Sequence, residues 1–477
     1  MRLPEVDPSL ETDSVRRTNA TLRQLLARRY EAVEEESAEL IVEGALTREP
    51  DAAGKTLPPR LIFAHGALGD PGHWLLTIPF LRACDCLAFS SSSDRGIFER
   101  LAGSVRCRTA WLPLCVDTEV FRPRPELRQT LRARYGLAER TPLLLTVSAL
   151  SPGKNVQSAL LLLRELRRSR PDACCWIVGA GSQAYLADLA QRLGVSAAVR
   201  FMGAVSREAL SELYPAADLL VHLTLNRKEN LGLVSLEAQA CGVPVLAARW
   251  GGVGDTLVHG ETGYVADAYL VGAERRVDWL ALLRPALQLL ADAALARRVG
   301  AAARARVVRE YSPAALARRL YRVIDRQLAG ETADQRSLTL SAAAEQLVVA
   351  FAARAAQHPE ASDSAQVSEA LREPFEGEFA YRVIHEQMAL PEPPARGQDA
   401  LAYRLLDAMM DASECLDVRD PMWTGCVQLT ASEAAVWGAL SEPMDRDALQ
   451  AHLGPESAQV IAALYARGLI GLTQPGA

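Results

Sequence analysis

Several features that would indicate a particular protein class are scarce or missing in these 477 residues. The chain contains no run of 18 apolar residues, and residues 1–17 include no apolar stretch. We therefore expect neither a membrane span nor a secretory signal. Only 3 of the 52 basic residues are lysine, and the formal net charge is −6. A mildly acidic chain of this kind disfavours nucleic acid as the main partner.

The nine cysteines follow no pattern either. They include no C-x-x-C pair, and no histidine lies at metal-ligand spacing from them. An odd, scattered set is typical of reduced thiols in the cytoplasm, so we expect a cytoplasmic protein with no structural metal. The remaining composition is ordinary for a globular protein, with 49% apolar and 23% charged residues. The length suits about two to four domains.

From about residue 140 onwards, short apolar runs alternate with amphipathic stretches. The apolar runs predict buried strands at 143–147, 174–178, 199–201, 219–221 and 245–247. The amphipathic stretches predict helices at 156–168, 184–193, 207–214 and 232–240. This alternation is typical of a parallel α/β sheet with right-handed crossovers. An arginine-rich region, 297–326, predicts further helix that is broken at Ser312 and Pro313, with its arginines at the surface.

The N-terminal part follows the same pattern less regularly. Residues 14–40 predict a helix in which arginines precede glutamates, and such a helix is either solvated or an interaction surface. Further strands are predicted at 60–64, 86–89 and 110–112. The two halves, 40–130 and 140–330, would be two Rossmann-like domains that face a cleft. Ligands bind at the carboxyl ends of the strands in such sheets.

The segment from Glu229 to Glu237 carries the densest chemistry. It reads as a loop that opens a helix, and its amides would be free to bind an anion such as a diphosphate: Asn230, Leu231, Gly232 and Leu233. Gly232 would let a ligand approach the backbone closely. Glu237 could accept hydrogen bonds from a ribose diol, and Glu229 from hydroxyls that the phosphate carries. The spacing alone fits an ordinary surface loop and helix equally well.

Residues 140–325 resemble the donor-binding half of retaining glycosyltransferases of family 4, also called group 1, which have the GT-B fold. Glu229 and Glu237 match the E-x7-E signature of that family. Further motifs follow in the family's order: the phosphate loop from Ser148 to Asn155, the turn with Gly179 and Gly181, the segment with Met202 and Gly203, and the glycines at 251–252 and 260–263. Residues 85–93, with the pattern D-x-x-x-x-S, and 112–123 resemble segments of the family's other half.

The resemblance implies a metal-independent transferase that moves a sugar from a UDP- or GDP-linked donor to an acceptor with retention, and that needs no other cofactor. Lys154 and the amides at 230–233 would hold the leaving diphosphate. Glu229 would orient the sugar and Glu237 would bind the ribose. The remaining matched positions would line the nucleotide: Ser148, Gly179, Gly181, Met202 and Gly203. His65 matches the histidine that the family places over the donor sugar. The resemblance thus implies three catalytic residues, which are His65, Lys154 and Glu229.

Two departures from the family pattern stand out. The family's diphosphate-binding arginine is Ala149 here, and a lost charge-assisted bond of this kind is worth roughly 1.5–3 kcal/mol. Arg227, Lys228 or Arg249 could compensate. The opening strand and glycine-rich loop of the usual acceptor domain are also missing, so the N-terminal domain is short. These departures leave a non-catalytic scaffold or regulator as an alternative function.

The C-terminal tail resembles PqqD-like domains, which are small winged-helix domains that bind leader peptides. The match lies in a strand at 427–429, helices at 431–440, 445–453 and 456–467, and a β tail at 468–472. A ribosomally made peptide recruited by this tail is then the expected acceptor, and a lipid or polysaccharide precursor is the alternative. A generic helical cap is the other interpretation of the tail.

The fold class predicted overall is therefore α/β of the GT-B type, followed by a small winged-helix-like α+β domain. The predicted domains are an acceptor-side Rossmann-like domain with a leading helix (1–130), a donor-binding Rossmann-like domain (131–330), a helical linker (331–395) and the winged-helix domain (396–477).

Overall fold

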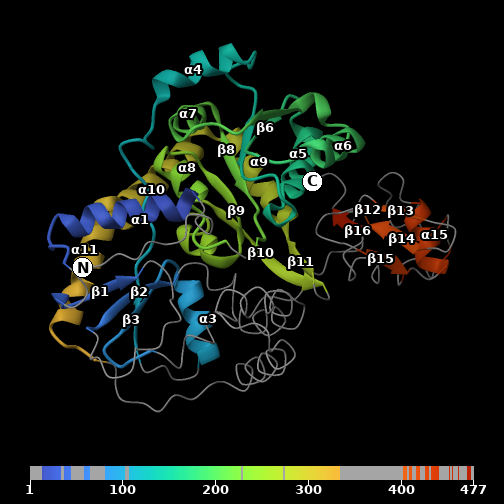
Figure 1. Cartoon of the computed structure of the whole chain (residues 1–477). Coiled ribbons are helices and arrows are strands. Elements are labelled where there is room, and N and C mark those ends of the chain that lie inside the picture. Colours follow the sequence, from blue (N-terminus) through green and yellow to red (C-terminus); the bar gives the residue numbers. More distant parts are fainter. Residues whose placement is uncertain are drawn as a thin grey trace.

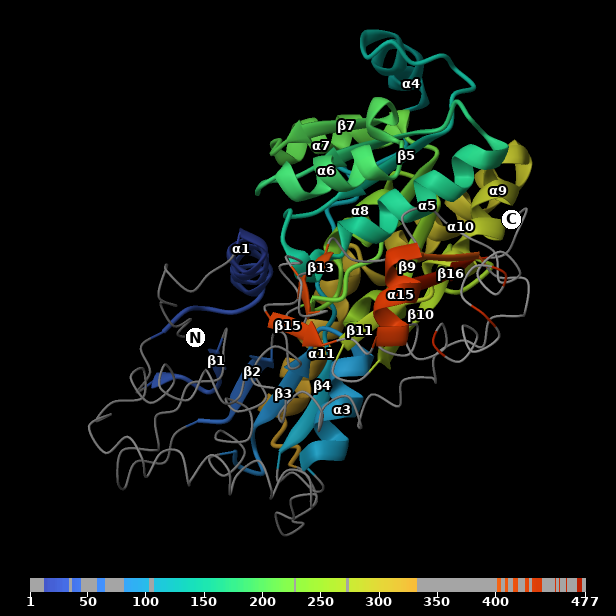
Figure 2. The ribbon, with the colours of Figure 1, turned by 90° about the vertical axis from the view of Figure 1, so that its right-hand side faces the viewer.

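The computed structural model describes residues 13–33, 37–43, 58–64, 81–102, 107–226, 229–271 and 274–332, together with short segments between residues 401 and 473. Two sheets dominate the part before residue 333. A four-stranded sheet has the order β1-β2-β3-β4, and a seven-stranded sheet has the order β11-β10-β9-β8-β5-β6-β7. Figure 1 shows the two sheets with their helices, and Figure 2 shows the smaller sheet below the larger one.

The larger sheet carries most of the apolar core. Its strands are β5 (Leu143–Val147), β6 (Cys174–Val178), β7 (Val199–Gly203), β8 (Leu219–His222), β9 (Val245–Arg249), β10 (Tyr264–Val271) and β11 (Glu274–Val277). All neighbours pair in parallel except β10 and β11, which form an antiparallel hairpin. The predicted strands are confirmed to within two residues. The antiparallel hairpin was not predicted from the sequence.

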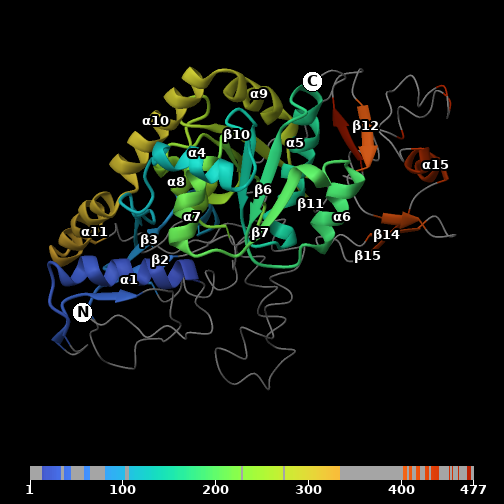
Figure 3. The same ribbon diagram turned by 90° about the horizontal axis from the view of Figure 1, so that it is seen from above.

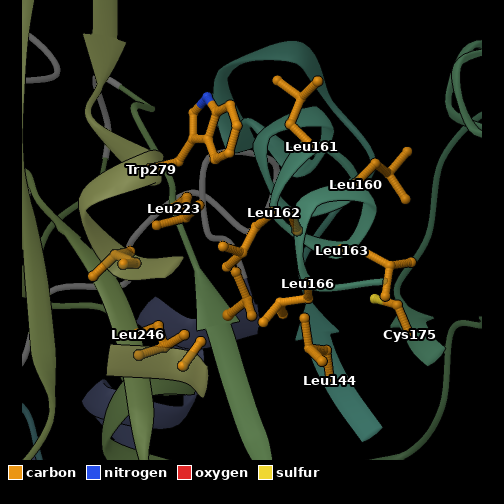
Figure 4. Packing of buried hydrophobic residues seen from close by; sticks show 14 of the residues in the cluster. Leu144, Leu160, Leu161, Leu162, Leu163, Leu166, Cys175, Leu223, Leu246 and Trp279 are labelled. Carbon is orange, nitrogen blue, oxygen red and sulfur yellow. The ribbon is translucent and has the colours of Figure 1, made fainter. Parts of the chain in front are cut away.

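Helices cover both faces of this sheet. They are α5 (Val156–Ser169), α6 (Ala184–Arg192), α7 (Arg207–Leu213), α8 (Leu233–Ala240), α9 (Leu283–Ala291) and α10 (Ala293–Glu310). Leu144 of β5 packs in the same cluster as α5 and α9, whereas its neighbours Leu143 and Leu145 pack in the cluster that contains α8. Figure 4 shows the first cluster, with α5 leucines around Leu144. This alternation is the period of two that a strand covered on both faces requires.

The smaller sheet is built from β1 (Ile41–Glu43), β2 (Arg60–Ala64), β3 (Cys86–Phe89) and β4 (Arg108–Trp111), all in parallel. The helix α3 (Ser92–Ala102) follows β3, and α4 (Pro125–Arg134) links the two sheets along the chain. Asp85, which is fully buried, anchors the start of β3. Its carboxylate pairs with Arg60 at 2.8 Å and with Arg82 at 2.9 Å. The strand predictions for this half are confirmed, with β4 shifted towards the N-terminus.

The predicted helix over 14–40 was wrong in extent. The helix α1 spans Asp13–Ala27 only, and β1 begins at Ile41. Leu22, Leu25 and Leu26 are buried in one cluster with leucines of α11 (Pro313–Leu328), so this helix is neither fully solvated nor free for a partner on that face. Figure 3 shows α1 alongside α11, which continues the line of α10. Contacts with α11 continue past the end of this helix, because the Tyr30 ring packs edge-to-face against Tyr321 and Arg29 pairs with Asp325 at 2.8 Å.

The prediction that all arginines of 297–326 lie at the surface was also partly wrong. The guanidinium of Arg304 donates hydrogen bonds to the carbonyls of Thr118, Phe121 and Ala240, so it ties α10 to the end of α8 and to the chain before α4. The predicted break at Ser312 is confirmed, because the Ser312 hydroxyl caps α11 by accepting from the Ala315 amide.

The C-terminal segments form two small antiparallel sheets. One pairs β12 (Leu401–Arg404) with β16 (Ile470–Thr473), and the other contains β13 (Ala408–Met410), β14 (Cys415–Val418) and β15 (Gly425–Gln428). The helix α15 spans Ala431–Ala439, which confirms the helix predicted there. The predicted helices at 445–453 and 456–467 and the linker up to 395 lie almost wholly outside the described residues, so the winged-helix fold stays a prediction.

Among the described residues, no single helix has the length and apolarity to cross a membrane. One pair, Trp279–Ala291 with Ala293–Leu328, passes that test only when taken together, and it is bent by 109°.

Candidate active site

The carboxyl ends of β5, β6 and β7 are drawn together by backbone contacts. The Ser148 amide donates to the Val178 carbonyl at 2.9 Å, and the Gly179 amide donates to the Gly203 carbonyl at 2.9 Å. A Cβ atom at Gly179 would lie 1.7 Å from the Ser148 carbonyl oxygen, and φ there is +153°. Only glycine fits this contact. Three of the predicted nucleotide-lining residues therefore meet at one edge of the sheet.

The other two predicted lining residues lie beside this contact. A Cβ atom at Gly181 would lie 2.9 Å from the Leu150 side chain, so Gly181 allows a second close approach of the two loops. Met202 is half-buried and packs against the core cluster that contains Trp176 and Val178. Its side chain therefore supports the sheet.

The helix α8 begins one residue later than predicted. Gly232 precedes it in a left-handed conformation with φ +76°, and a Cβ atom there would lie 2.7 Å from a methyl carbon of Val253. Leu231 is buried in the core below, and Leu233 is partly buried. Within the described part of the chain, the amides of residues 230–233 make no hydrogen bond to a backbone carbonyl. This helix N-terminus therefore has the free donors that an anion site needs.

Lys154 and Glu229 form an ion pair beside this turn. The Lys154 Nζ atom lies 2.6 Å from Glu229 Oε2, and the Thr224 hydroxyl donates to the same oxygen at 3.1 Å. Burial acts to raise the pKa of Glu229, but Lys154 and the hydrogen bonds outweigh it and hold that pKa below its usual value. The carboxylate is therefore ionised at neutral pH, and the structure brings together two of the three predicted catalytic residues.

Glu237 lies on α8 with 7% of its surface exposed. The Tyr214 hydroxyl donates to Glu237 Oε2 at 3.4 Å. Burial, with the nearby Glu237 charge, raises the pKa of Tyr214 well above its ordinary value, so this hydroxyl stays a donor. The third predicted catalytic residue, His65, lies outside the described residues, as do Arg227 and Lys228. Arg249 pairs with Asp267 at 2.8 Å, so this structure does not show it compensating for the arginine that Ala149 replaces.

Contacts across the two halves were not predicted from the sequence. The Ser90 hydroxyl, at the end of β3, donates to the Asn230 side-chain oxygen at 2.6 Å. The Ser93 amide and hydroxyl both donate to the Asp255 carboxylate, at 3.0 and 2.9 Å. A Cβ atom at Gly252 would lie 2.0 Å from the Asn230 carbonyl oxygen. The D-x-x-x-x-S segment that ends at Ser90 was the available sequence signal for this interface.

No group of three or more histidine, cysteine, aspartate or glutamate side chains in the described segments could hold a metal ion.

The central part of the chain is similar to known proteins. Residues 128–306 match the family model described as glycosyl transferases group 1. A GDP-mannose-dependent alpha-(1-6)-phosphatidylinositol monomannoside mannosyltransferase from Mycolicibacterium smegmatis is 38% identical over 228 residues, which cover 46% of this chain and 56% of that protein. The N-acetyl-alpha-D-glucosaminyl L-malate synthase of Bacillus anthracis is 33% identical over 182 residues, or 38% of this chain and 44% of that protein.

The chain thus spans little more than half the length of the mannosyltransferase that it matches. Among solved structures, the Anabaena protein HepE in complex with UDP aligns with a TM-score of 0.52 at 18% identity, covering 67% of this chain and 84% of that one. Sucrose-phosphate synthase from Thermosynechococcus elongatus aligns with a TM-score of 0.51 at 20% identity, covering 68% and 82%. These likenesses confirm the predicted GT-B fold for the two-sheet part of the chain.

Proposed function

We propose that this protein is a retaining glycosyltransferase of family 4 that transfers a sugar from a UDP- or GDP-linked donor in the cytoplasm. The observation that carries the proposal is the Lys154–Glu229 pair, with its 2.6 Å contact, beside the glycine turn that opens α8. A cation and a carboxylate in contact at a helix N-terminus suit a ligand that carries both phosphate and hydroxyl groups. The group 1 match over 128–306 includes all of these residues.

The proposed roles follow from the chemistry of each group. Lys154 and the amides of residues 230–233 would bind the diphosphate and stabilise the charge that develops on it as it leaves, without a metal ion. Glu229 would accept hydrogen bonds from the sugar and Glu237 from the ribose. The acceptor hydroxyl would attack the anomeric carbon from the face that the diphosphate leaves, which retains the configuration.

Two acceptor classes are proposed, each on its own observation. A peptide acceptor, recruited by residues 396–477, is supported by the resemblance of that tail to peptide-binding domains. A lipid precursor is supported by the names of the related mannosyltransferases, which act on phosphatidylinositol monomannoside. Incubation with a radiolabelled donor and either a co-encoded short peptide or vesicles that contain phosphatidylinositol monomannoside separates the two, because label would enter only one of these acceptors.

A thermal-shift panel with UDP, GDP, ADP and dTDP tests the donor site. A nucleotide at 100 times its dissociation constant should stabilise the protein by about 2.7 kcal/mol. Glu237→Gln should reduce that shift, because it removes a charged acceptor without changing the side-chain volume. Glu212→Gln, at an exposed position on α7, is the matched control and should leave the shift unchanged. No shift with any of the four nucleotides would contradict the proposal and favour a non-catalytic scaffold, with Ala149 as the cause.

A further inference from the structure

His222 is a titratable residue of the site that the proposed roles leave unused. It ends β8, pairs in register with Ala247 of β9, and has 4% of its surface exposed. Its Nε2 atom is buried and has no hydrogen-bond partner within the described part of the chain. A Cβ atom at Gly232 would lie 3.6 Å from that nitrogen. The imidazole therefore lies directly beneath the turn that opens α8.

Among the described residues, both members of the ion pair, Glu229 and Lys154, act electrostatically on this imidazole. Burial lowers the pKa of His222 to about 4, Glu229 opposes the shift, and Lys154 adds to it. The ring is therefore neutral at physiological pH in this structure. A buried polar atom without a hydrogen-bond partner is unfavourable, and native proteins hold few of them. The buried Nε2 atom thus points to a role in another state of the site.

Diphosphate binding changes the charges around His222. If Lys154 turns to the diphosphate, Glu229 loses its cation while only 11% of its side chain is exposed. An uncompensated buried carboxylate is strongly unfavourable. Departure of Lys154 also removes the repulsion that disfavours the imidazolium form, whereas the attraction of Glu229 remains. Both changes favour protonation of His222.

We propose that His222 is a positioning residue of the donor site, which takes up one proton from solvent on donor binding and replaces Lys154 as the counter-charge of Glu229. The imidazolium then holds the Glu229 carboxylate ionised beneath the sugar, so that its oxygens can accept hydrogen bonds from sugar hydroxyls. This inference rests on the proposed donor site. The added claim is that one residue, His222, couples donor binding to the uptake of a proton.

Isothermal titration calorimetry of the full chain with UDP-glucose and with GDP-mannose tests it, in buffers of different ionisation enthalpy between pH 5.5 and 7.5. Nucleotide-sugars are the probes because the terminal phosphate of a free nucleoside diphosphate titrates near pH 6 itself. We expect uptake of up to one proton, and an affinity that falls by up to about tenfold per pH unit as the pH rises.

The variant His222→Gln replaces the imidazole with an amide that can form hydrogen bonds but cannot titrate, so it should bind without proton uptake and with a flat pH dependence. His259→Gln is the matched control, because the Nδ1 atom of His259 contacts the Val265 carbonyl at 3.1 Å in the turn before β10. The His259→Gln variant should take up as many protons on donor binding as the unmodified protein.

Each outcome decides between the two proposals. Binding without proton uptake in the unmodified protein would overturn the role of His222 and leave the donor site standing, whether or not the variant folds. Uptake that persists in His222→Gln would assign the proton to another group, such as Glu229, and would equally overturn it. No binding of either nucleotide-sugar would overturn the donor site and this inference together.

Discussion

Replacing Lys154 by methionine should destabilise the larger domain, because it leaves the Glu229 carboxylate without its cation. The two side chains are 23% and 11% exposed, so the pair lies between the surface and buried limits. Breaking a fully buried pair costs about 3–5 kcal/mol, and an exposed pair contributes about 0–1 kcal/mol. We expect a loss of about 2 kcal/mol, which lowers the Tm by about 4–8 °C in a domain of this size. Thermal denaturation at pH 7 measures it.

The Lys154–Glu229 ion pair also determines how the loss of stability in Lys154→Met depends on pH. The pKa of Glu229 is lower in the folded protein than its ordinary value of 4.5, so the stabilisation is present above pH 4.5. It disappears as the pH falls through the folded pKa, because the carboxyl group then takes up a proton. The difference in Tm between the unmodified protein and Lys154→Met should therefore shrink below pH 4.5.

A double-mutant cycle shows whether the two side chains interact. Lys154→Met combined with Glu229→Gln should recover most of the lost stability, with a coupling energy of about 0.5–3 kcal/mol. Arg249→Met is the matched control, since it breaks a pair with Asp267 that is 54% exposed on both sides. It should cost less than about 1 kcal/mol. Losses that simply add in the double variant would refute the ion pair.

Three further substitutions test the fold around the site. Gly179→Ala should cost roughly 1–3 kcal/mol and weaken nucleotide binding in titration, because its Cβ would lie 1.7 Å from the Ser148 carbonyl oxygen. Burial, with repulsion from Asp255, raises the pKa of Asp94 to about 8. The folded state thus binds the proton more tightly, so stability should fall as the pH rises from 4 to 8, and Asp94→Asn should remove this fall in urea titrations. Asp85→Asn should cost about 3–5 kcal/mol in the same assay, because the buried Arg60 loses its charged partner; a cost below 1 kcal/mol would contradict that pairing.

Much of the larger sheet could be predicted because its signals are local. An apolar run such as Leu143–Val147 is buried on both faces, so it reads as a strand without knowledge of its neighbours. The helix start near Gly232 was predicted to within one residue, and the structure holds this glycine in a left-handed conformation, which glycine adopts readily. The β10–β11 hairpin was missed because β11 has three consecutive charged residues, and because β10, apolar except for Asp267, cannot be told from a buried helix by its pattern alone. The predicted helix was too long because the pattern of charged residues continues beyond Ala27, where α1 ends.

The sequence by itself determined the strand and helix alternation, the glycine turns and the residue types that suit a phosphate and a sugar. These features depend on side-chain size, on the periodicity of apolar residues and on the conformational freedom of glycine, all of which act over a few residues. Only the tertiary structure decided that Lys154 meets Glu229, 75 residues away, and that Ser90 holds Asn230 across the two sheets. Such contacts depend on the sheet order, which places β5 beside β8. The same packing buries His222 where the charges of Glu229 and Lys154 both act on it.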